Sequence, residues 1–332
     1  PDFFEAYSNL GAILNDLGKS REAELYARKA IELKPDFVGA HVNLGLILKE
    51  LGKLKEAKKE FEKCIELKPN ETNYHSNLLS ILSSLCSWDE IDKYLANLNH
   101  IEKVSKATTN PFDLMHLEDD LENELKRAVE FSQSSKRDPL PNLASYNHRR
   151  INIGYFSSDF RNHAVSFVLT RVLELHDSSR FNIYAYSLSK QSDGYTERIK
   201  NAVYCFRDVS HLSDIEIVNI ARNDQIDIAI DLNGITKLNR KFIFDYRVAP
   251  IQVNYFGYPG TMGSKSFDYI IANKLLIPEE NKKFYTEKVL YLPDNIIPID
   301  DTLHIDNRKF TREELGLPLD SFVFTCFNRI EK

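Results

Sequence analysis

A histidine and an aspartate lie four residues apart, directly after the first apolar run in the second half of the chain. That run, INIGYF at residues 151–156, leads through SSDFRNHAVS into a helical pattern, so Asp159, Asn162 and His163 fall in a strand-to-helix loop. The positive field of a helix start disfavours protonation of a histidine and keeps its imidazole available as an acceptor or base. Asp159 is close enough to orient the imidazole or to receive a proton. The alternative, a helix cap at Asp159 and a surface His163, is favoured by the local sequence alone.

Two further apolar runs end in polar, glycine-bearing segments. The run IDIAIDL at 226–232 is followed by Asn233, Gly234 and Thr236. The run IQVNYFG at 251–257 continues as GYPGTMG, a tight loop whose exposed backbone amides suit a sugar or a phosphate. It is neither the GxxxxGK[ST] nor the GxGxxG phosphate-binding pattern. Ordinary capping and turn chemistry would explain each segment taken alone.

The spacing of these runs predicts the elements that must position the loops. Short runs rich in β-branched and aromatic residues alternate with helical segments, which is typical of a mainly parallel sheet covered on both faces. The expected strands are 151–156, 181–188, 226–232, 251–257, 288–293 and 321–327, and the expected helices are 165–176, 213–224 and 238–247. Because ligands gather at the carboxyl ends of such strands, the three polar loops are expected to form one site.

The first half of the chain repeats with a period of 34 residues. This period predicts tetratricopeptide units, helical hairpins that bury a core only by stacking on one another. A third, degenerate unit begins at residue 77, and we expect Trp88 to cover the end of the stack. The matching positions are Leu10 and Leu44, Gly11 and Gly45, Gly18 and Gly52, Ala23 and Ala57, and Pro35 and Pro69.

One polar position also follows the period, at Asn9, Asn43 and Asn77. Each falls on the first helix of its unit, and first helices line the concave side of such a solenoid. An asparagine amide both donates and accepts, so a ladder of these side chains would suit the backbone of an extended peptide. A helix-packing role explains the position equally well.

The length of 332 residues accommodates two domains. Residues 111–135 are predicted to form connecting helices, and the Pro- and Asn-rich segment 138–150 is predicted to be a linker. The expected organisation is therefore repeats at 1–105 (two full units and one degenerate), connecting helices and linker at 106–150, and an α/β lobe at 151–332. The chain starts at Pro1 rather than methionine, so we expect it to be part of a longer protein.

Composition excludes several classes of partner. The net charge is −6 and the basic residues form no block, which argues against a nucleic-acid partner. The apolar runs are far too short to span a membrane. Four cysteines without a CxxC pair argue against a cysteine-based zinc site. They are expected to be buried thiols in a reducing compartment, which favours a cytoplasmic protein.

The repeats and motifs together resemble the O-GlcNAc transferase family over nearly the whole chain. The motifs are the element Cys86-Ser87-Trp88-Asp89, then GYFSSDFRNHAVS, DLNGITK and RVAPIQVNYFGYPGTMGSKSFDYIIAN, in the order and spacing of that family. The resemblance implies a repeat solenoid followed by a Rossmann-like lobe, the first lobe of a two-lobed, metal-independent GT-B fold. The closing SFVFTCFNRIEK resembles the first strand of the second lobe.

The resemblance also implies an activity and a set of site residues. The family transfers a sugar from a nucleotide donor to Ser or Thr of proteins with inversion, here from UDP-GlcNAc and without a cofactor. His163 and Asp159 match catalytic-site positions, and His116 is the nearest candidate for a further catalytic-site histidine in the connecting segment. The residues that match substrate-side loops are Asn162, Asn233, Thr236, Phe256, Gly257 and Pro259.

Two other functions remain open. SPINDLY-type relatives share this layout and use GDP-fucose, and a peptide-binding scaffold without activity would also retain the repeats. The resemblance places the donor-phosphate lysine and the base-binding residues in the second lobe. We therefore expect the chain alone to bind donor poorly and to turn over little. The expected partners are protein substrates in the repeat groove and a nucleotide sugar, with no nucleic acid and no membrane.

Overall fold

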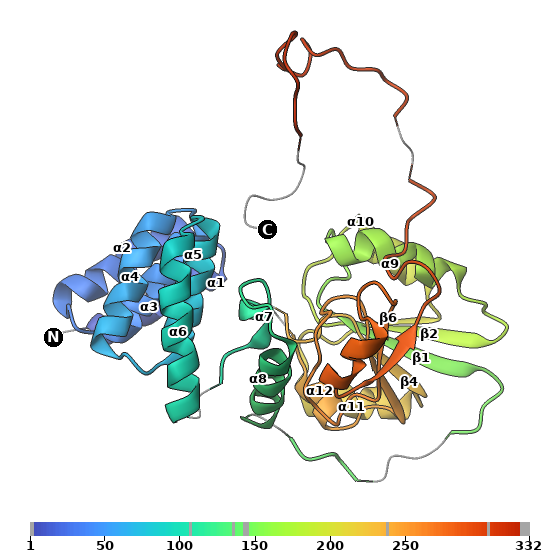
Figure 1. The fold of residues 1–332 in the computed structure, drawn as a ribbon. Coiled ribbons are helices and arrows are strands. Elements are labelled where there is room, and N and C mark those ends of the chain that lie inside the picture. Colours follow the sequence, from blue (N-terminus) through green and yellow to red (C-terminus); the bar gives the residue numbers. More distant parts are fainter. Residues whose placement is uncertain are drawn as a thin grey trace. The chain divides into compact units, whose positions relative to one another are not determined.

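A computed structural model describes residues 3–105, 108–134, 137–141, 146–236, 239–303 and 306–325. The chain divides into two compact units, Pro1–Thr109 with Asn307–Lys332, and Asn110–Asp306. Figure 1 shows the helical hairpins in blue and the sheet in green to orange.

The predicted repeats are present as three helical hairpins. Glycines allow the paired helices to approach closely: a Cβ atom on Gly45 would lie 2.7 Å from the ring of Phe61, and one on Gly11 would lie 3.2 Å from the carbonyl oxygen of Ala23. The period of 34 residues therefore reflects packing between helices. The helices are α1 (Phe4–Asp16), α2 (Ser20–Leu33), α3 (Val38–Glu50), α4 (Leu54–Leu67), α5 (Thr72–Ser84) and α6 (Trp88–Ser105).

Two expectations are wrong, one for Trp88 as the cover of the repeat stack and one for burial of all the cysteines. Trp88 is 60% exposed, and α6 instead buries Ile91 and Leu98. The tryptophan is the first residue of its helix, at the end of the element. Cys86 is exposed and Cys205 is half-buried, whereas Cys64 is buried as expected. The fourth cysteine, at position 326, lies outside the described residues.

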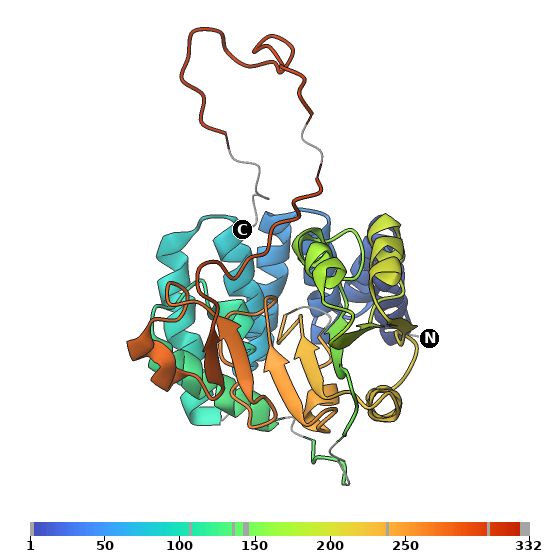
Figure 2. The same ribbon diagram turned by 90° about the vertical axis from the view of Figure 1, so that its right-hand side faces the viewer.

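The second unit contains the predicted parallel sheet, with seven strands in the order β3-β2-β1-β4-β5-β6-β7. All the strand pairs are parallel, so their carboxyl ends share one edge (Figure 2). The strands are β1 (Ile151–Ser157), β2 (Phe181–Ser187), β3 (Cys205–Asp208), β4 (Ile228–Asp231), β5 (Ile251–Asn254), β6 (Tyr269–Ala272) and β7 (Lys288–Tyr291).

Helices cover both faces of this sheet, and two helices of the connecting segment belong to the same unit. The fold class predicted from the sequence, a repeat solenoid followed by a Rossmann-like lobe, is confirmed. The helices are α7 (Pro111–Leu114), α8 (Leu121–Ser134), α9 (Ala164–Leu175), α10 (Gly194–Ala202), α11 (Asp214–Asn223), α12 (Phe242–Asp245) and the 3-10 helix η1 (Glu279–Phe284).

Some elements differ from the predicted ones. The helix expected at 238–247 shortens to α12, and β3, β6 and α10 were not predicted. The strand expected over 321–327 is not formed over residues 321–325, and residues 326–332 lie outside the described part of the chain. A strand needs a hydrogen-bonded neighbour, and the side chains of Phe322 and Phe324 are exposed.

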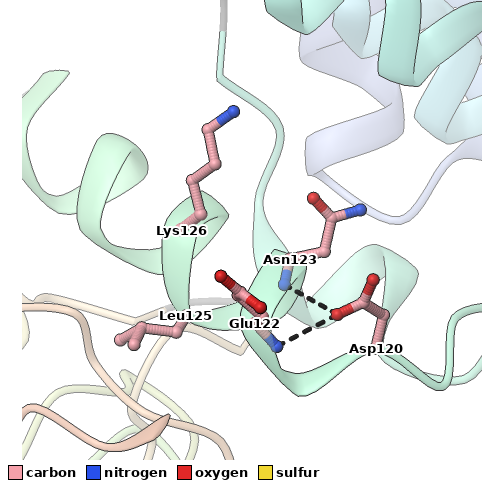
Figure 3. Close-up of a pocket in the computed structure, with 5 residues that line it drawn as sticks. All are labelled: Asp120, Glu122, Asn123, Leu125 and Lys126. Atoms are coloured by element: carbon pink, nitrogen blue, oxygen red, sulfur yellow. Dashed lines mark hydrogen bonds between the residues drawn. The ribbon is translucent and has the colours of Figure 1, made fainter.

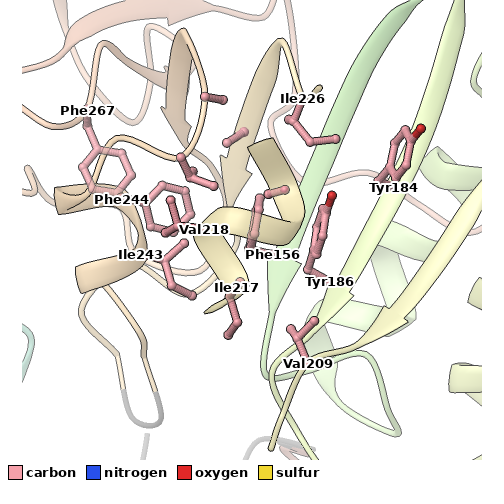
Figure 4. Close-up of a cluster of buried hydrophobic side chains, with 14 of the residues drawn as sticks. Phe156, Tyr184, Tyr186, Val209, Ile217, Val218, Ile226, Ile243, Phe244 and Phe267 are labelled. Atoms are coloured by element: carbon pink, nitrogen blue, oxygen red, sulfur yellow. The ribbon is translucent and has the colours of Figure 1, made fainter. Parts of the chain in front are cut away.

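Two apolar clusters fix the strands between the helices. On one face, Leu169 and Leu173 of α9 and Ile199 of α10 belong to a cluster with Ile153 and Ile183 of the sheet. On the other face, Phe156 and Tyr186 stack with their ring centroids 4.4 Å apart, and side chains of α11 and α12 belong to the same cluster (Figure 4). Phe131 of α8 packs against this cluster. The central strands are therefore part of a close-packed core, which fixes where their carboxyl ends lie.

Candidate functional site

Three strand-end loops lie together at the carboxyl edge of the sheet. The loop after β1 is joined to the loop after β4, because the amide of Ser158 donates to Asn233 Oδ1 at 2.8 Å. The loop after β5 packs directly on the same segment: a Cβ atom on Gly257 would lie 2.0 Å from the carbonyl oxygen of Leu232. A glycine is therefore required at position 257, because any side chain there would collide with backbone. The parallel sheet brings the three loops into one place, as expected.

His163 is the N-cap residue of α9, and its Nδ1 accepts from the amide of Val165 at 3.3 Å. A neutral imidazole that accepts at Nδ1 carries its proton on Nε2. His163 is therefore set up to donate a hydrogen bond from Nε2, and the alternative in which Asp159 caps the helix is wrong.

Asp159 is nearly buried beside the histidine. Its Oδ1 lies 3.7 Å from His163 Nδ1 and 3.3 Å from a guanidinium nitrogen of Arg161. Its Oδ2 accepts from the side-chain amide of Asn233 at 2.9 Å. Both oxygens of the carboxylate thus contact protein groups, which fixes its orientation beside His163.

Asn233 joins the loops rather than facing solvent. Its side-chain amide donates to Ser158 Oγ at 2.9 Å as well as to Asp159, and its oxygen is used by the amide of Ser158. The residue is 2% exposed. The sequence placed Asn233 on the substrate side of the loop, but its side chain is occupied within the protein, and it positions Asp159.

The remaining predicted residues of the two glycine-bearing loops shape the backbone. Thr236 donates to the carbonyl oxygen of Asn233 at 2.8 Å, and Pro259 accepts from the hydroxyl of Tyr285 at 3.2 Å. Phe256 has a φ of 77°, a conformation that costs energy for a non-glycine residue. Gly257 follows it directly. Strained backbone beside a close loop contact marks this turn as one that the fold maintains at a cost.

Asp231, at the end of β4, is a buried acid beneath the loops. Burial raises its pKa to about 7, although hydrogen bonds from the amides of Asn233 and Gly234 act in the opposite direction. Its Oδ1 accepts from the amide of Asn233 at 2.9 Å. The protonation state of Asp231 therefore affects the backbone that carries Asn233.

The connecting segment reaches the same loops through residues that sequence reasoning missed. The side chain of Asn110 donates to the carbonyl oxygen of Ile235 at 2.9 Å. The ring of Phe112 packs edge-to-face on Tyr258, with centroids 6.2 Å apart. An Asn-Pro helix start was the available signal, since Asn110 caps α7. These contacts place α7 against the loops after β4 and β5.

His116 lies in the turn after α7 and is exposed as a residue. Nearby protein atoms desolvate its ring enough to lower its pKa, and Asp113 acts in the opposite direction. The predicted catalytic role of His116 stays a prediction.

The three repeat asparagines have different surroundings. Asn9 is exposed. The amide of Asn43 donates to the hydroxyl of Ser8 at 2.9 Å and to its carbonyl oxygen at 3.2 Å, so it joins α3 to α1. The amide of Asn77 donates to the carbonyl oxygen of Asn73, one turn earlier in α5, at 2.7 Å. Helix packing thus accounts for Asn43, and a peptide-binding role stays a prediction for all three.

A cavity of about 450 Å³ lies at the start of α8, lined by Asp120, Glu122, Asn123, Leu125 and Lys126 (Figure 3). Asp120 accepts there from the amides of Glu122 and Asn123, at 3.1 and 3.0 Å, and so caps the helix. The carboxylate of Asp120 is therefore used to cap α8, and the lining of the cavity contains no residue of the strand-end loops.

No group of three or more His, Cys, Asp or Glu side chains in the part of the chain that the structure describes is placed to hold a metal ion. No helix in the described ranges has the length and apolarity needed to cross a membrane.

Comparison with known proteins gives a consistent result for both units. A family described as glycosyl transferase family 41 matches residues 136–310, and tetratricopeptide repeats match residues 4–37 and 38–71. A probable UDP-N-acetylglucosamine–peptide N-acetylglucosaminyltransferase of Arabidopsis thaliana, SEC, is 37% identical over 200 residues, 58% of this chain. The corresponding enzyme of Caenorhabditis elegans is 37% identical over 149 residues, 44% of this chain.

A solved structure shares the arrangement of the fold. A mutant of the Thermobaculum terrenum O-GlcNAc transferase aligns with a TM-score of 0.73 and 25% identity over 95% of this chain. The alignment covers 64% of the Thermobaculum chain, and the segments matched in the Arabidopsis and Caenorhabditis proteins are 20% and 13% of their lengths. The chain thus spans only part of each of these relatives.

Proposed function

We propose that this chain, which belongs to glycosyl transferase family 41, is part of an enzyme that transfers N-acetylglucosamine from UDP-GlcNAc to Ser or Thr hydroxyls of proteins. The observation that carries the proposal is the junction of the three strand-end loops, in which Asn233 fixes Asp159 beside His163. The names of the Arabidopsis and Caenorhabditis relatives support the donor and the acceptor class.

Transfer of the sugar to a hydroxyl group makes two demands on the residues of these loops. An acceptor hydroxyl must be held in line with the anomeric carbon of the sugar, and its proton must be removed. We assign His163 to the first task, as a neutral ring that donates from Nε2 to a polar group of the donor or acceptor. Asp159 lies 3.7 Å from Nδ1 of that ring, and Asn233 and Arg161 fix its carboxylate there. We assign Asp159 to the second task, as the group that receives the proton.

The leaving diphosphate needs positive charge or helix dipoles. We propose that these come from a second lobe of a GT-B enzyme, that the reaction inverts the anomeric centre, and that it needs no metal or other cofactor. The chain alone is then expected to bind UDP-GlcNAc weakly and to give no measurable transfer. A measurable transfer rate from residues 1–332 would contradict this part of the proposal.

The role of His163 is tested in the full-length protein. His163→Ala removes the ring and is expected to lower the transfer rate about 100-fold, as loss of one preorganised donor does. His163→Asn keeps an N-cap residue and a donor group, so it should retain more activity than the alanine variant. Transfer is followed by mass spectrometry of an acceptor protein. A wild-type rate in His163→Ala would remove His163 from the mechanism.

The same assay decides the donor. UDP-GlcNAc and GDP-fucose are supplied separately to the full-length protein, and transfer only from GDP-fucose would replace the proposed donor. No transfer from either would favour a peptide-binding scaffold.

We further propose that the repeats capture extended segments of protein substrates through the asparagine positions. Asn9→Ala and Asn77→Ala give the clearer test, because Asn43→Ala would also break the contact between α3 and α1. Both variants are expected to weaken capture of protein substrate while leaving hydrolysis of the donor unchanged. Equal loss of both activities would indicate misfolding instead.

A further inference from the structure

Helix α10 begins with a capping box whose residues have a second set of contacts. Asp193 Oδ1 accepts from the amides of Tyr195 and Thr196, at 2.9 and 3.3 Å, and Thr196 Oγ1 accepts from the amide of Asp193 at 3.0 Å. These bonds satisfy the start of α10, as a capping box does. They use only one of the two carboxylate oxygens.

The other contacts reach the loop after β1. Asp193 Oδ2 accepts from the amide of Asn162 at 2.5 Å, and Thr196 Oγ1 donates to the carbonyl oxygen of Phe160 at 2.7 Å. The first turns of α9 and α10 also touch, since the rings of Phe167 and Tyr195 lie 5.0 Å apart. The Arg161–Asn162 peptide, one residue before His163, is thus tied to α10, whereas His163 itself caps α9.

The loop is therefore held from two sides. Asn233 fixes Ser158 and Asp159 from the loop after β4, and Asp193 with Thr196 fixes Phe160 and the amide of Asn162 from α10. Three backbone amides converge on the carboxylate of Asp193. Burial acts to raise its pKa, but the hydrogen bonds from Asn162, Thr196 and Tyr195 outweigh it and lower the pKa below its ordinary value.

We propose that Asp193 is a positioning residue for the transferase reaction, which fixes the Arg161–Asn162 peptide next to His163 and thereby the direction of the imidazole. The inference rests on the proposed function for its catalytic consequence. A carboxylate is needed because it offers acceptors in two directions, one for α10 and one for the loop. An asparagine offers one acceptor, and its NH₂ group would face an amide donor.

Two variants and one control isolate this role. Asp193→Asn removes one acceptor, and Thr196→Val removes the bond to Phe160 at nearly constant volume. The control is Ser213→Ala, which breaks the capping box at the start of α11. The hydrogen bonds of that box join Ser213 and Glu216 to each other. Ser213→Ala removes an N-cap outright, whereas Asp193→Asn leaves an N-cap residue in place. Loss of a cap alone therefore predicts no larger effect in Asp193→Asn than in Ser213→Ala.

The first measurement needs no activity and uses this chain. The amide proton of Asn162, bonded to a carboxylate, is expected to resonate downfield in NMR spectra and to exchange slowly with solvent. Asp193→Asn should move it upfield and speed its exchange at least 10-fold, and Ser213→Ala should not. An Asn162 amide that is unchanged in Asp193→Asn would overturn the proposal.

The second measurement uses the full-length protein. Asp193→Asn and Thr196→Val are expected to lower kcat for transfer about 10-fold more than Ser213→Ala, with little change in KM for the donor. Equal kcat in Asp193→Asn and Ser213→Ala would overturn the positioning role. If the wild-type protein shows no transfer, the proposed function fails and the positioning role fails with it, while the NMR result still decides whether Asp193 holds the loop.

Discussion

Asn233 and Asp159 show how a single buried amide can organise a site. Asn233 supplies hydrogen bonds to a backbone amide, a hydroxyl and a carboxylate of the neighbouring loop. We expect Asn233→Ala to lower the free energy of unfolding by about 1–3 kcal/mol, because the buried partners lose their bonds. Asn233→Asp should cost more, since it places a second carboxylate against Asp159. Urea unfolding of the chain measures both.

The exposed Asn162 offers a matched control for this prediction. Asn162→Ala removes an asparagine side chain from the same loop and is expected to change the free energy of unfolding by less than about 0.5 kcal/mol. If Asn233→Ala behaved like Asn162→Ala, the joining role of Asn233 would be wrong.

The buried acid Asp231 gives a prediction with a definite sign. Its pKa is raised from an ordinary value of 3.8 to about 7, so the folded state favours the protonated form. The stability that Asp231 contributes is fully present below pH 3.8 and is lost as the pH rises through 7. Asp231→Asn stays neutral and keeps an acceptor for the amide of Asn233. Relative to wild type it should therefore gain more than about 2 kcal/mol of unfolding free energy between pH 4 and pH 8. Parallel pH profiles of the two proteins would contradict this.

At the scale of elements, the turn of each repeat hairpin uses one backbone conformation. Gly18, Gly52 and Cys86 occupy the same register position, with φ values of 76°, 72° and 55°. A side chain in this left-handed region costs roughly 1 kcal/mol. Cys86→Gly is therefore expected to raise the free energy of unfolding of the repeats by about 1 kcal/mol, measured by thermal or urea unfolding.

Gly52 provides the reciprocal test of this turn. A Cβ atom there would meet nothing within 4 Å, so Gly52→Ala has only a backbone cost and should destabilise by about the same amount. If Cys86→Gly lowered the stability, the thiol would be making a contact that outweighs its backbone cost.

The elements also show why parts of the fold followed from the sequence. The strands with strong apolar runs, β1, β2, β4, β5 and β7, were predicted near their observed bounds. The edge strand β3 was missed because CFRD has no alternation and its side chains are at most half-buried. The helix α10 was missed because it is short and starts at Gly194, and its cap, Asp193 with Thr196, lacks the Ser/Thr-x-x-Glu pattern.

The site was predictable only to the level of its loops. Asp159, Asn233 and Gly257 each follow a strand of a parallel sheet, and this alone predicted that they lie close together. The hydrogen bonds of Asn233 depend on β1 lying next to β4, and the strand order is not visible in the sequence. The same limit applies to α7, where the sequence pointed to His116 while the observed ring contact with Tyr258 is made by Phe112.

At the scale of the whole molecule, the connecting helices belong to the α/β unit rather than to a linker between units. The side chains of Met115 and Phe131 pack against the core cluster of the sheet. A Cβ atom on Gly263, which has a φ of 61°, would lie 2.2 Å from the backbone of Ala128 in α8. Backbone packed this closely on backbone is typical of one cooperative unit.

This packing predicts where the chain can be divided. A chain trimmed to residues 110–306 should unfold in one cooperative transition, whereas one trimmed to residues 146–306 loses α7 and α8 and exposes the surface under Met115 and Phe131. Because burying a large apolar side chain contributes about 1.5–3 kcal/mol, the shorter chain should be less stable by about 3 kcal/mol or more. Urea unfolding of both trimmed chains, with circular dichroism as the probe, measures the difference. Equal stability would mean that α7 and α8 do not stabilise the lobe. The contacts of Asn110 and Phe112 would then not be required to hold the strand-end loops in place.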